Sequence, residues 1–167
     1  MKNFKEFMFH SRQGFTLIEL LVVVAIVGIL AAITLGYLSS AKGRGEETAV
    51  KSNLATARTA IEMFFLNNGN TYLPSGHSSV AGTTCPTYND GTINMFSLNK
   101  DIAGSIAEAV KRGDYGSYCY NSDAKWAVAV GLKLATNKSW CIDVSGTAKL
   151  VNYLPSNAVD PITNLCK

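Results

Sequence analysis

The sequence predicts an α+β fold, in which one long N-terminal helix packs on an antiparallel β-sheet. Three observations lead to this fold class. An apolar run of 24 residues, 15–38, follows a short polar head. Apolar residues between positions 50 and 64 then recur at spacings of three and four, and residues 126–153 alternate with a period of two. A helical period followed by a strand period along the chain is typical of an α+β domain.

The apolar run Phe15–Leu38 predicts a helix that spans a membrane. As a helix it reaches about 36 Å, and a bilayer core is about 30 Å thick. A secretory signal peptide is the alternative, since Ser39-Ser40-Ala41 follows, but its apolar region is usually only about 7–15 residues long. The run also carries Glu19 as its fifth residue. A lone charge inside a membrane costs roughly 2.5–3.5 kcal/mol, so we expect Glu19 to have a partner.

The helical pattern continues beyond the apolar run. Apolar side chains form one face of an amphipathic helix at Val50, Leu54, Ala57, Ile61 and Phe64. The segment Asn67–Asn70 predicts the end of this helix, with glycine as the C-cap. We therefore expect one helix from about Phe15 to Asn68, roughly 80 Å long.

The rest of the chain predicts a loop, a second helix and a small sheet. Residues Pro74–Gly91 are rich in serine, threonine, glycine and asparagine and predict the loop. Spacing of isoleucine and valine predicts the second helix at Leu98–Arg112. Three alternating runs predict an antiparallel meander: Trp126–Leu134, Trp140–Val144 and Leu150–Tyr153. We expect its apolar face to pack on the 50–64 stripe, and the tail Pro155–Lys167 to be irregular and held by Cys166.

Four cysteines lie beyond the apolar run, at positions 85, 119, 141 and 166. None forms a Cys-x-x-Cys pair, so the spacing of a zinc site is missing. An even number in a domain beyond a membrane segment favours disulfides in an oxidising compartment over free thiols or metal binding. Three pairings are possible. We prefer Cys85–Cys119 with Cys141–Cys166, because this pairing gives two separate local loops.

The charge distribution argues against a dedicated nucleic-acid-binding protein. Three of the 15 basic and one of the 12 acidic residues lie in the first fourteen positions, which leaves a net charge of only +1. Nucleic-acid binding usually needs a clustered basic face. Basic residues both precede and follow the apolar run, so the positive-inside rule does not fix its orientation. The cysteines place the long domain outside and the head in the cytoplasm.

The segment Gly14-Phe15-Thr16-Leu17-Ile18-Glu19 and the apolar run after it resemble the type IV pilin family, including the pseudopilins of type II secretion systems. The close match covers about 25 residues. The long helix, the meander and the cysteine-closed tail agree with the family in layout. The head of fourteen residues is longer than many leaders of the commonest subclass.

The resemblance implies that a membrane prepilin peptidase cuts between Gly14 and Phe15 and N-methylates Phe15. Residues 1–14 would then be a leader, 15–38 a membrane and filament-core helix segment, and 39–167 an extracytoplasmic globular domain. A cytoplasmic ATPase and an inner-membrane platform protein would move the subunit from the inner membrane into a helical homopolymer at the cell surface. The resemblance allows three uses for this filament: motility, adhesion or DNA uptake.

The resemblance also implies roles for single residues. Cleavage creates an ammonium group at Phe15, four residues before Glu19, which places both groups on one helix face. The Glu19 carboxylate would pair with this amine, or with that of a neighbouring subunit; the alternative is that Glu19 reaches the lipid headgroups. Gly28 and Gly36 lie where family members often unwind locally in the filament. Cys141 and Cys166 would bracket the variable D-region.

Other residues give no sign of an enzyme, a cofactor or a metal site. His10 lies in the leader and His77 in a polar loop, and the sequence shows no evident nucleophile near either histidine. Asp143 and Asp160 could join a calcium site, but solvated loop carboxylates are the simpler interpretation. Trp126 and Trp140 fit the sheet, and Asn137-Lys138-Ser139 matches the short glycosylation pattern.

The sequence therefore predicts a structural pilus subunit rather than an enzyme. Within the family, the alternative is a pseudopilin of a secretion or competence system. From another class, the alternative is a single-pass membrane protein with a periplasmic ligand-binding domain.

Overall fold

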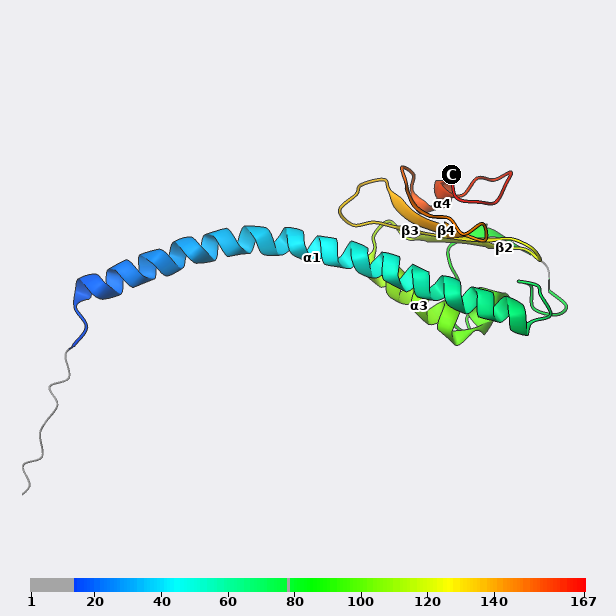
Figure 1. Cartoon of the computed structure of the whole chain (residues 1–167), viewed down its shortest axis with the longest axis horizontal. Helices are drawn as coiled ribbons and strands as arrows, with labels where there is room; N and C mark the ends of the chain where they lie inside the picture. The colour runs from blue at the N-terminus through cyan, green and yellow to red at the C-terminus, as the bar shows by residue number, and fades with distance from the viewer. Residues whose placement is uncertain (1–13, 78) are drawn as a thin grey trace, which may run out of the picture. The chain divides into compact units, whose positions relative to one another are not determined.

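The computed structural model describes residues 14–77 and 79–167 (Figure 1). Contacts divide the chain into two compact units, one ending at Ser40 and the other comprising Ala41–Lys167. Helix α1, Leu17–Asn67, contributes residues to both. The leader expected at 1–14 lies outside the described residues except for Gly14.

The single long helix expected at Phe15–Asn68 is confirmed to within two residues by α1. Its end lies where the Asn67–Asn70 segment predicted it. Gly69 has a φ of 71°, in the left-handed region that favours glycine, and the Asn70 N–H donates to the Phe65 carbonyl at 3.0 Å. The chain thereby turns back toward the sheet.

The second unit contains a five-stranded antiparallel sheet in the order β1-β2-β3-β4-β5. The strands are β1 Val80–Thr83, β2 Ser117–Asn121, β3 Trp126–Gly131, β4 Ser139–Asp143 and β5 Ala148–Val151. The predicted meander is confirmed, with β3, β4 and β5 at the three expected runs. Strand β3 ends at Gly131 rather than Leu134. The Leu132 N–H still donates across to Lys138 at 3.0 Å, and the chain then turns, with the Lys138 N–H donating back to the Ala135 carbonyl at 3.0 Å.

Two strands were not predicted. The Pro74–Gly91 segment was expected to be a loop throughout, which is wrong for β1. This strand is short and pairs with β2 through an irregular register, and it contains Gly82, so its sequence lacks the usual apolar alternation. Strand β2 pairs with β3 over five residues.

Three further helices complete the unit: α2 Met95–Leu98, α3 Lys100–Arg112 and α4 Pro155–Ala158. The helix expected at Leu98–Arg112 begins two residues later, because the Asn99 side chain caps α3 by accepting from the Asp101 and Ile102 N–H groups. The tail expected to be irregular contains α4 and a bridge between Val159 and Cys166.

The main core of the second unit lies between the helices and one face of the sheet. In Figure 1 the sheet has α1 and α3 on one side and α4 with the C-terminal segment on the other. The α1 stripe Val50, Leu54, Ala57 and Ile61 is fully buried against a cluster that includes Trp126, Val128, Val130 and Ile142. The expected packing of the 50–64 stripe on the sheet is confirmed.

A smaller apolar cluster lies on the opposite face of the sheet. Ala127 and Ala129 of β3 and Cys141 of β4 pack there with Val151, Ala158, Val159 and Cys166. Alanine side chains leave room for the C-terminal segment to approach the strand closely. The sheet is therefore covered on both faces, which explains why every residue of β3 is buried.

The connection between α3 and β2 lies very close to the end of β3 at Gly131. The Asp114 N–H donates to the Gly131 carbonyl at 3.0 Å, and the Gly131 N–H donates to Gly116 at 3.1 Å. A Cβ at Gly131 would overlap the Asp114 carbonyl oxygen, whereas one at Gly104 in α3 would meet nothing within 4 Å. We predict that Gly131→Ala destabilises the protein by about 1–3 kcal/mol. Gly104→Ala should stabilise it by up to about 1 kcal/mol.

Urea unfolding of the full chain in detergent micelles, followed by the fluorescence of Trp126 and Trp140, measures both changes. Equal stability of the two variants would contradict this account of the β3 end.

Candidate functional site

The first described residues form an N-terminal capping box on α1. Thr16 precedes the helix, and Glu19 is its third residue. One Glu19 carboxylate oxygen, Oε2, accepts from the Thr16 backbone N–H at 2.9 Å and from the Thr16 hydroxyl at 2.8 Å. The Thr16 hydroxyl oxygen accepts in turn from the Glu19 N–H at 3.3 Å. These reciprocal bonds satisfy donors that the first turn of a helix otherwise leaves unpaired.

In the uncut chain, therefore, Glu19 already has a partner in Thr16. The expected partner, an amine at Phe15, exists only after cleavage. Among residues 14–77 and 79–167, Oε1 of Glu19 accepts no hydrogen bond, so this oxygen is open to a second donor. The sequence reasoning missed the cap, although Thr-x-x-Glu before an apolar run is its usual pattern.

The bond between Gly14 and Phe15 lies outside the helix. Both residues precede Leu17, both are exposed, and the Phe15 side chain is 82% exposed. A peptidase needs its target bond in a non-helical, accessible segment. The geometry at Gly14 and Phe15 meets that requirement.

The α1 segment after Glu19 exposes apolar side chains on all of its faces. Every residue from Leu20 to Leu38 is exposed. Within the described residues, α1 is the one helix long and apolar enough to cross a membrane by length and composition. A surface of this kind requires lipid or protein around it.

Gly28 and Gly36 both lie inside the continuous helix α1. No heavy atom lies within 4 Å of the place where a Cβ would be at either glycine. Their conformation in this single chain is helical. They lower the cost of unwinding because glycine is a poor helix former.

The structure pairs Cys85 with Cys119 and Cys141 with Cys166, the arrangement of two local loops. The two bonds lie on opposite faces of the sheet, because Cys119 belongs to the helix-side cluster and Cys141 to the opposite one. The folded sheet thus separates the two pairs.

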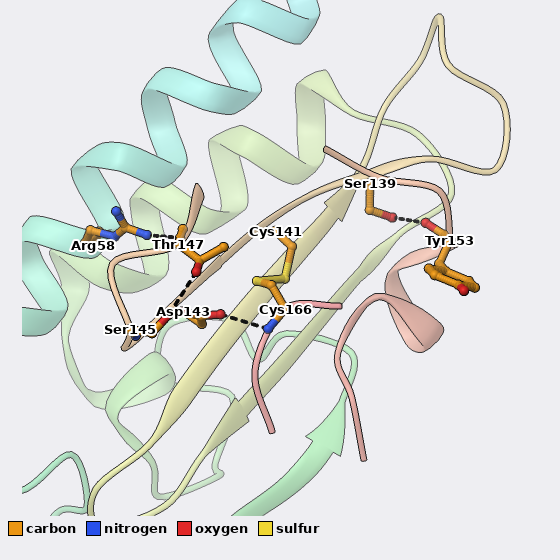
Figure 2. Close-up of a disulfide and its surroundings, with 8 residues drawn as sticks. All are labelled: Arg58, Ser139, Cys141, Asp143, Ser145, Thr147, Tyr153 and Cys166. Carbon is orange, nitrogen blue, oxygen red and sulfur yellow. Dashed lines mark hydrogen bonds between the residues drawn. A yellow bond between two sulfur atoms is a disulfide. The ribbon is translucent and has the colours of Figure 1, made fainter. Parts of the chain in front are cut away.

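Asp143 organises the surroundings of the Cys141–Cys166 disulfide (Figure 2). Its side chain lies at the end of β4 in a residue that is only 1% exposed. One carboxylate oxygen accepts from the Cys166 N–H at 2.8 Å, and the other accepts from the Ser145 N–H at 2.9 Å and the Ser145 hydroxyl at 2.5 Å. The expectation that Asp143 is a solvated loop carboxylate is wrong, because the C-terminal segment covers it.

Arg58 of α1 forms hydrogen bonds with the turn between β4 and β5 (Figure 2). Its guanidinium donates to the Gly146 carbonyl at 3.0 Å and also to the Thr147 carbonyl. Ser139 lies at the other end of β4, where its buried hydroxyl donates to the Tyr153 carbonyl at 2.6 Å. Helix α1, the β4–β5 turn and the disulfide are therefore connected by hydrogen bonds.

Asp160 closes the turn of the disulfide-bonded segment. One of its carboxylate oxygens accepts from the Ile162 N–H at 2.8 Å and the Thr163 N–H at 2.9 Å. These bonds, with Thr163 contributing most, lower the pKa of Asp160 below its usual value. The turn exposes Ile162, whose side chain is 87% accessible.

The remaining candidates do not converge on a catalytic or metal site. His10 lies outside the described residues, and His77 lies in the loop between α1 and β1. Among residues 14–77 and 79–167, no three His, Cys, Asp or Glu side chains are placed to hold a metal ion. Trp126 is fully buried, and Trp140 lies half-buried with the Lys51 ammonium 4.8 Å from its ring centre, so both are sheet residues as expected.

These features define a class of protein. A capped apolar helix, with an accessible Gly–Phe bond just before it, is followed by an α+β unit closed by disulfides. The family model described as "Prokaryotic N-terminal methylation motif" matches residues 9–35. The chain carries this motif.

Particular relatives make the resemblance more specific. The chain is 40% identical over 72 residues to the type IV major alpha-pilin of Moraxella bovis, covering 43% of this chain and 45% of that protein. It is 45% identical over 59 residues to the type IV wide pilus major component PilA4 of Thermus thermophilus, covering 35% and 45%. It is 36% identical over 59 residues to the type II secretion system core protein G of Klebsiella michiganensis, covering 35% and 42%.

The similarity to type IV pilins and to a type II secretion protein is thereby confirmed for part of the chain. The chain spans less than half the length of these curated relatives. No solved structure matches it.

The Asp143 carboxylate provides a prediction about the C-terminal segment. Asp143→Ala leaves the buried Cys166 N–H, and the N–H of the exposed residue Ser145, without their carboxylate acceptor. Hydrogen bonds to a charged group contribute about 1.5–3 kcal/mol each, so we expect a loss of roughly 3 kcal/mol in unfolding free energy. Asp123→Ala, at an exposed position of the β2–β3 turn, should change it by less than about 0.5 kcal/mol.

Urea unfolding with both disulfides intact measures this difference. Equal midpoints for the two alanine variants would show that Asp143 does not hold the C-terminal segment.

Proposed function

We propose that this chain is the precursor of a structural subunit of a type IV pilus. The observation that carries the proposal is the N-terminal arrangement. An exposed Gly14–Phe15 bond precedes a helix whose third residue is Glu19 and whose next nineteen residues, 20–38, are all exposed and almost all apolar. The match to the methylation motif and the names of the relatives support it.

The first step is removal of the leader by a prepilin peptidase on the cytoplasmic side, followed by N-methylation of Phe15. Glycine offers no side chain between the bond and the catalytic groups of the peptidase. The subunit is held in the inner membrane by residues 15–38, with residues 39–167 outside. An oxidising exterior is consistent with the two disulfides in the second unit.

The second step is pairing of Glu19 with the new amine at Phe15. The capping box supports this step because it holds the carboxylate at the N-terminal end of α1, close to residue 15, with Oε1 open. An ammonium and a carboxylate that leave water together need good geometry and further hydrogen bonds to offset desolvation. Thr16 supplies two of these bonds. In a filament the Phe15 amine of a neighbouring subunit would pair with the Glu19 carboxylate in the same way.

The third step is polymerisation into a helical homopolymer, with the apolar segments packed together in its core. A platform protein and an assembly ATPase would drive it, and Gly28 and Gly36 are the candidates for local unwinding. The function is structural rather than enzymatic.

A pseudopilin of a secretion or competence system is the second candidate. One observation favours it: the similarity to a protein named type II secretion system core protein G. Both candidates use the same N-terminal chemistry. They differ in whether the filament is displayed at the cell surface.

Two variants of Glu19 separate its charge from its capping role. Glu19→Gln keeps an acceptor for the Thr16 N–H but has no charge to form an ion pair with an amine, and Glu19→Ala loses both the acceptor and the charge. We predict that both variants are cleaved after Gly14 and that both fail to form normal filaments. Shear preparation and electron microscopy of surface filaments measure assembly, and the mass of the subunit measures cleavage.

Wild-type filament yield from Glu19→Gln, with loss only in Glu19→Ala, would assign Glu19 to helix capping. Wild-type yield from both variants would remove the pairing step altogether.

A further inference from the structure

The end of the second unit where α1 enters it carries basic and apolar side chains that the proposed function does not use. Lys42 and Arg44 of α1 are exposed. They follow Leu38, the last residue of the expected span, by four and six positions. Basic residues usually gather on the cytoplasmic side of a span, whereas these two follow it on the outer side. The usual placement of basic residues therefore does not explain Lys42 and Arg44.

The loop between β3 and β4 adds one basic and one apolar side chain, Lys133 and Leu134, to the same end of the unit. Gly43 is buried under Leu134, and a Cβ at Gly43 would lie 2.5 Å from the Leu134 side chain. The Glu47 carboxylate accepts from the Leu134 N–H at 3.2 Å, and the Lys133 ammonium pairs with Glu46 at 3.0 Å. The loop is thus fixed on α1, and the Leu134 side chain stays 51% exposed.

The connection between α3 and β2 lies beside this loop. The hydrogen bonds of Gly131 to Asp114 and Gly116 hold Tyr115 next to the end of β3. Tyr115 is 45% exposed and has a φ of 60°, in the left-handed region that tyrosine rarely adopts. The exposed Arg112 precedes it.

The acidic groups at this end are already engaged. The pKa of Glu46 lies below its usual value, first because Lys133 donates to the carboxylate and further because Lys42 and Arg112 lie nearby. Glu47 bonds to the β3–β4 loop, and Asp114 accepts from the Tyr115 N–H at 2.8 Å. Among the described residues, Lys42, Arg44 and Arg112 form no ion pair. The three carboxylates Glu46, Glu47 and Asp114 stand against four basic side chains, Lys42, Arg44, Arg112 and Lys133, so this end has a formal charge of +1.

We propose that this basic end, made of Lys42, Arg44, Arg112, Tyr115, Lys133 and Leu134, binds the anionic phosphate headgroups of the outer face of the membrane before assembly. Arginine and lysine recognise phosphate, and tyrosine is enriched at the headgroup level of membranes. The adjacency of Lys42 to the span keeps these side chains within reach of the headgroups. The inference rests on the proposed function, because it needs a subunit anchored by residues 15–38.

Reconstitution of the full chain in nanodiscs tests this proposal. Thr136→Cys places a fluorophore on the exposed part of the β3–β4 loop, and a lipid that is spin-labelled at its headgroup quenches the fluorophore on contact. We expect stronger quenching with phosphatidylglycerol present than with phosphatidylcholine alone. The difference should vanish at high salt, where charges are screened.

Charge reversal identifies the side chains. Each basic residue near an anionic surface contributes about a fivefold preference, so the double variant Lys42→Glu, Arg44→Glu should weaken the engaged state by at least about 25-fold. The matched control Lys100→Glu, Lys149→Glu removes two other exposed lysines with the same change in net charge and should quench like the wild type.

Quenching that is independent of phosphatidylglycerol, or an equal loss in both double variants, would overturn the proposal. Unchanged quenching with loss of filaments in the Lys42, Arg44 variant would instead make the basic end a contact between subunits. Adding the prepilin peptidase to the same nanodiscs tests the proposed function separately. An uncut Gly14–Phe15 bond would contradict the precursor assignment, whatever the quenching result.

Discussion

Packing of the α1 stripe against β3 is the interaction on which the rest of the second unit depends. Val50, Leu54 and Ile61 are fully buried there, and each such side chain contributes about 1.5–3 kcal/mol relative to exposure. The sheet that covers this stripe also separates the two disulfides and offers alanine side chains to the C-terminal segment. Through Arg58, the same helix reaches the β4–β5 turn beside Cys141–Cys166. A loss of contact at the stripe would therefore affect both faces of the sheet.

The same helix meets a different requirement in its first half, where apolar side chains face outward all round. A helix of this kind is stable only within lipid or among other helices. Its one charge, Glu19, lies at the end where the helix dipole is positive, so a carboxylate is favoured there even before any second partner arrives. The cap on Thr16 and the proposed pairing with Phe15 are thus compatible uses of one side chain. Processing of the chain would add a second partner for the carboxylate while the bonds to Thr16 remain.

The sequence alone could predict the parts of the fold that follow a simple period. Val50, Leu54, Ala57 and Ile61 determine the buried face of α1, and the alternation from Trp126 onward predicts the strands that pack on it. Strand β1 could not be found this way, because Gly82 makes room for Tyr118 and the strand has little side-chain surface of its own. Asp143 looked like a loop carboxylate, since its main partner, the Cys166 N–H, lies 23 residues further along the chain. At the N-terminus the sequence indicated the Gly14–Phe15 bond and Glu19, while the Thr16 cap was visible in the motif and missed.

The central claim is that α1 begins as part of a precursor and works as part of a mature subunit that starts at Phe15. Mass spectrometry of the chain purified from the membrane of its own host tests this claim most directly. The account predicts a mature N-terminus at N-methylated Phe15, with both disulfides present. An intact Met1, or a chain that starts after Ala41, would contradict it.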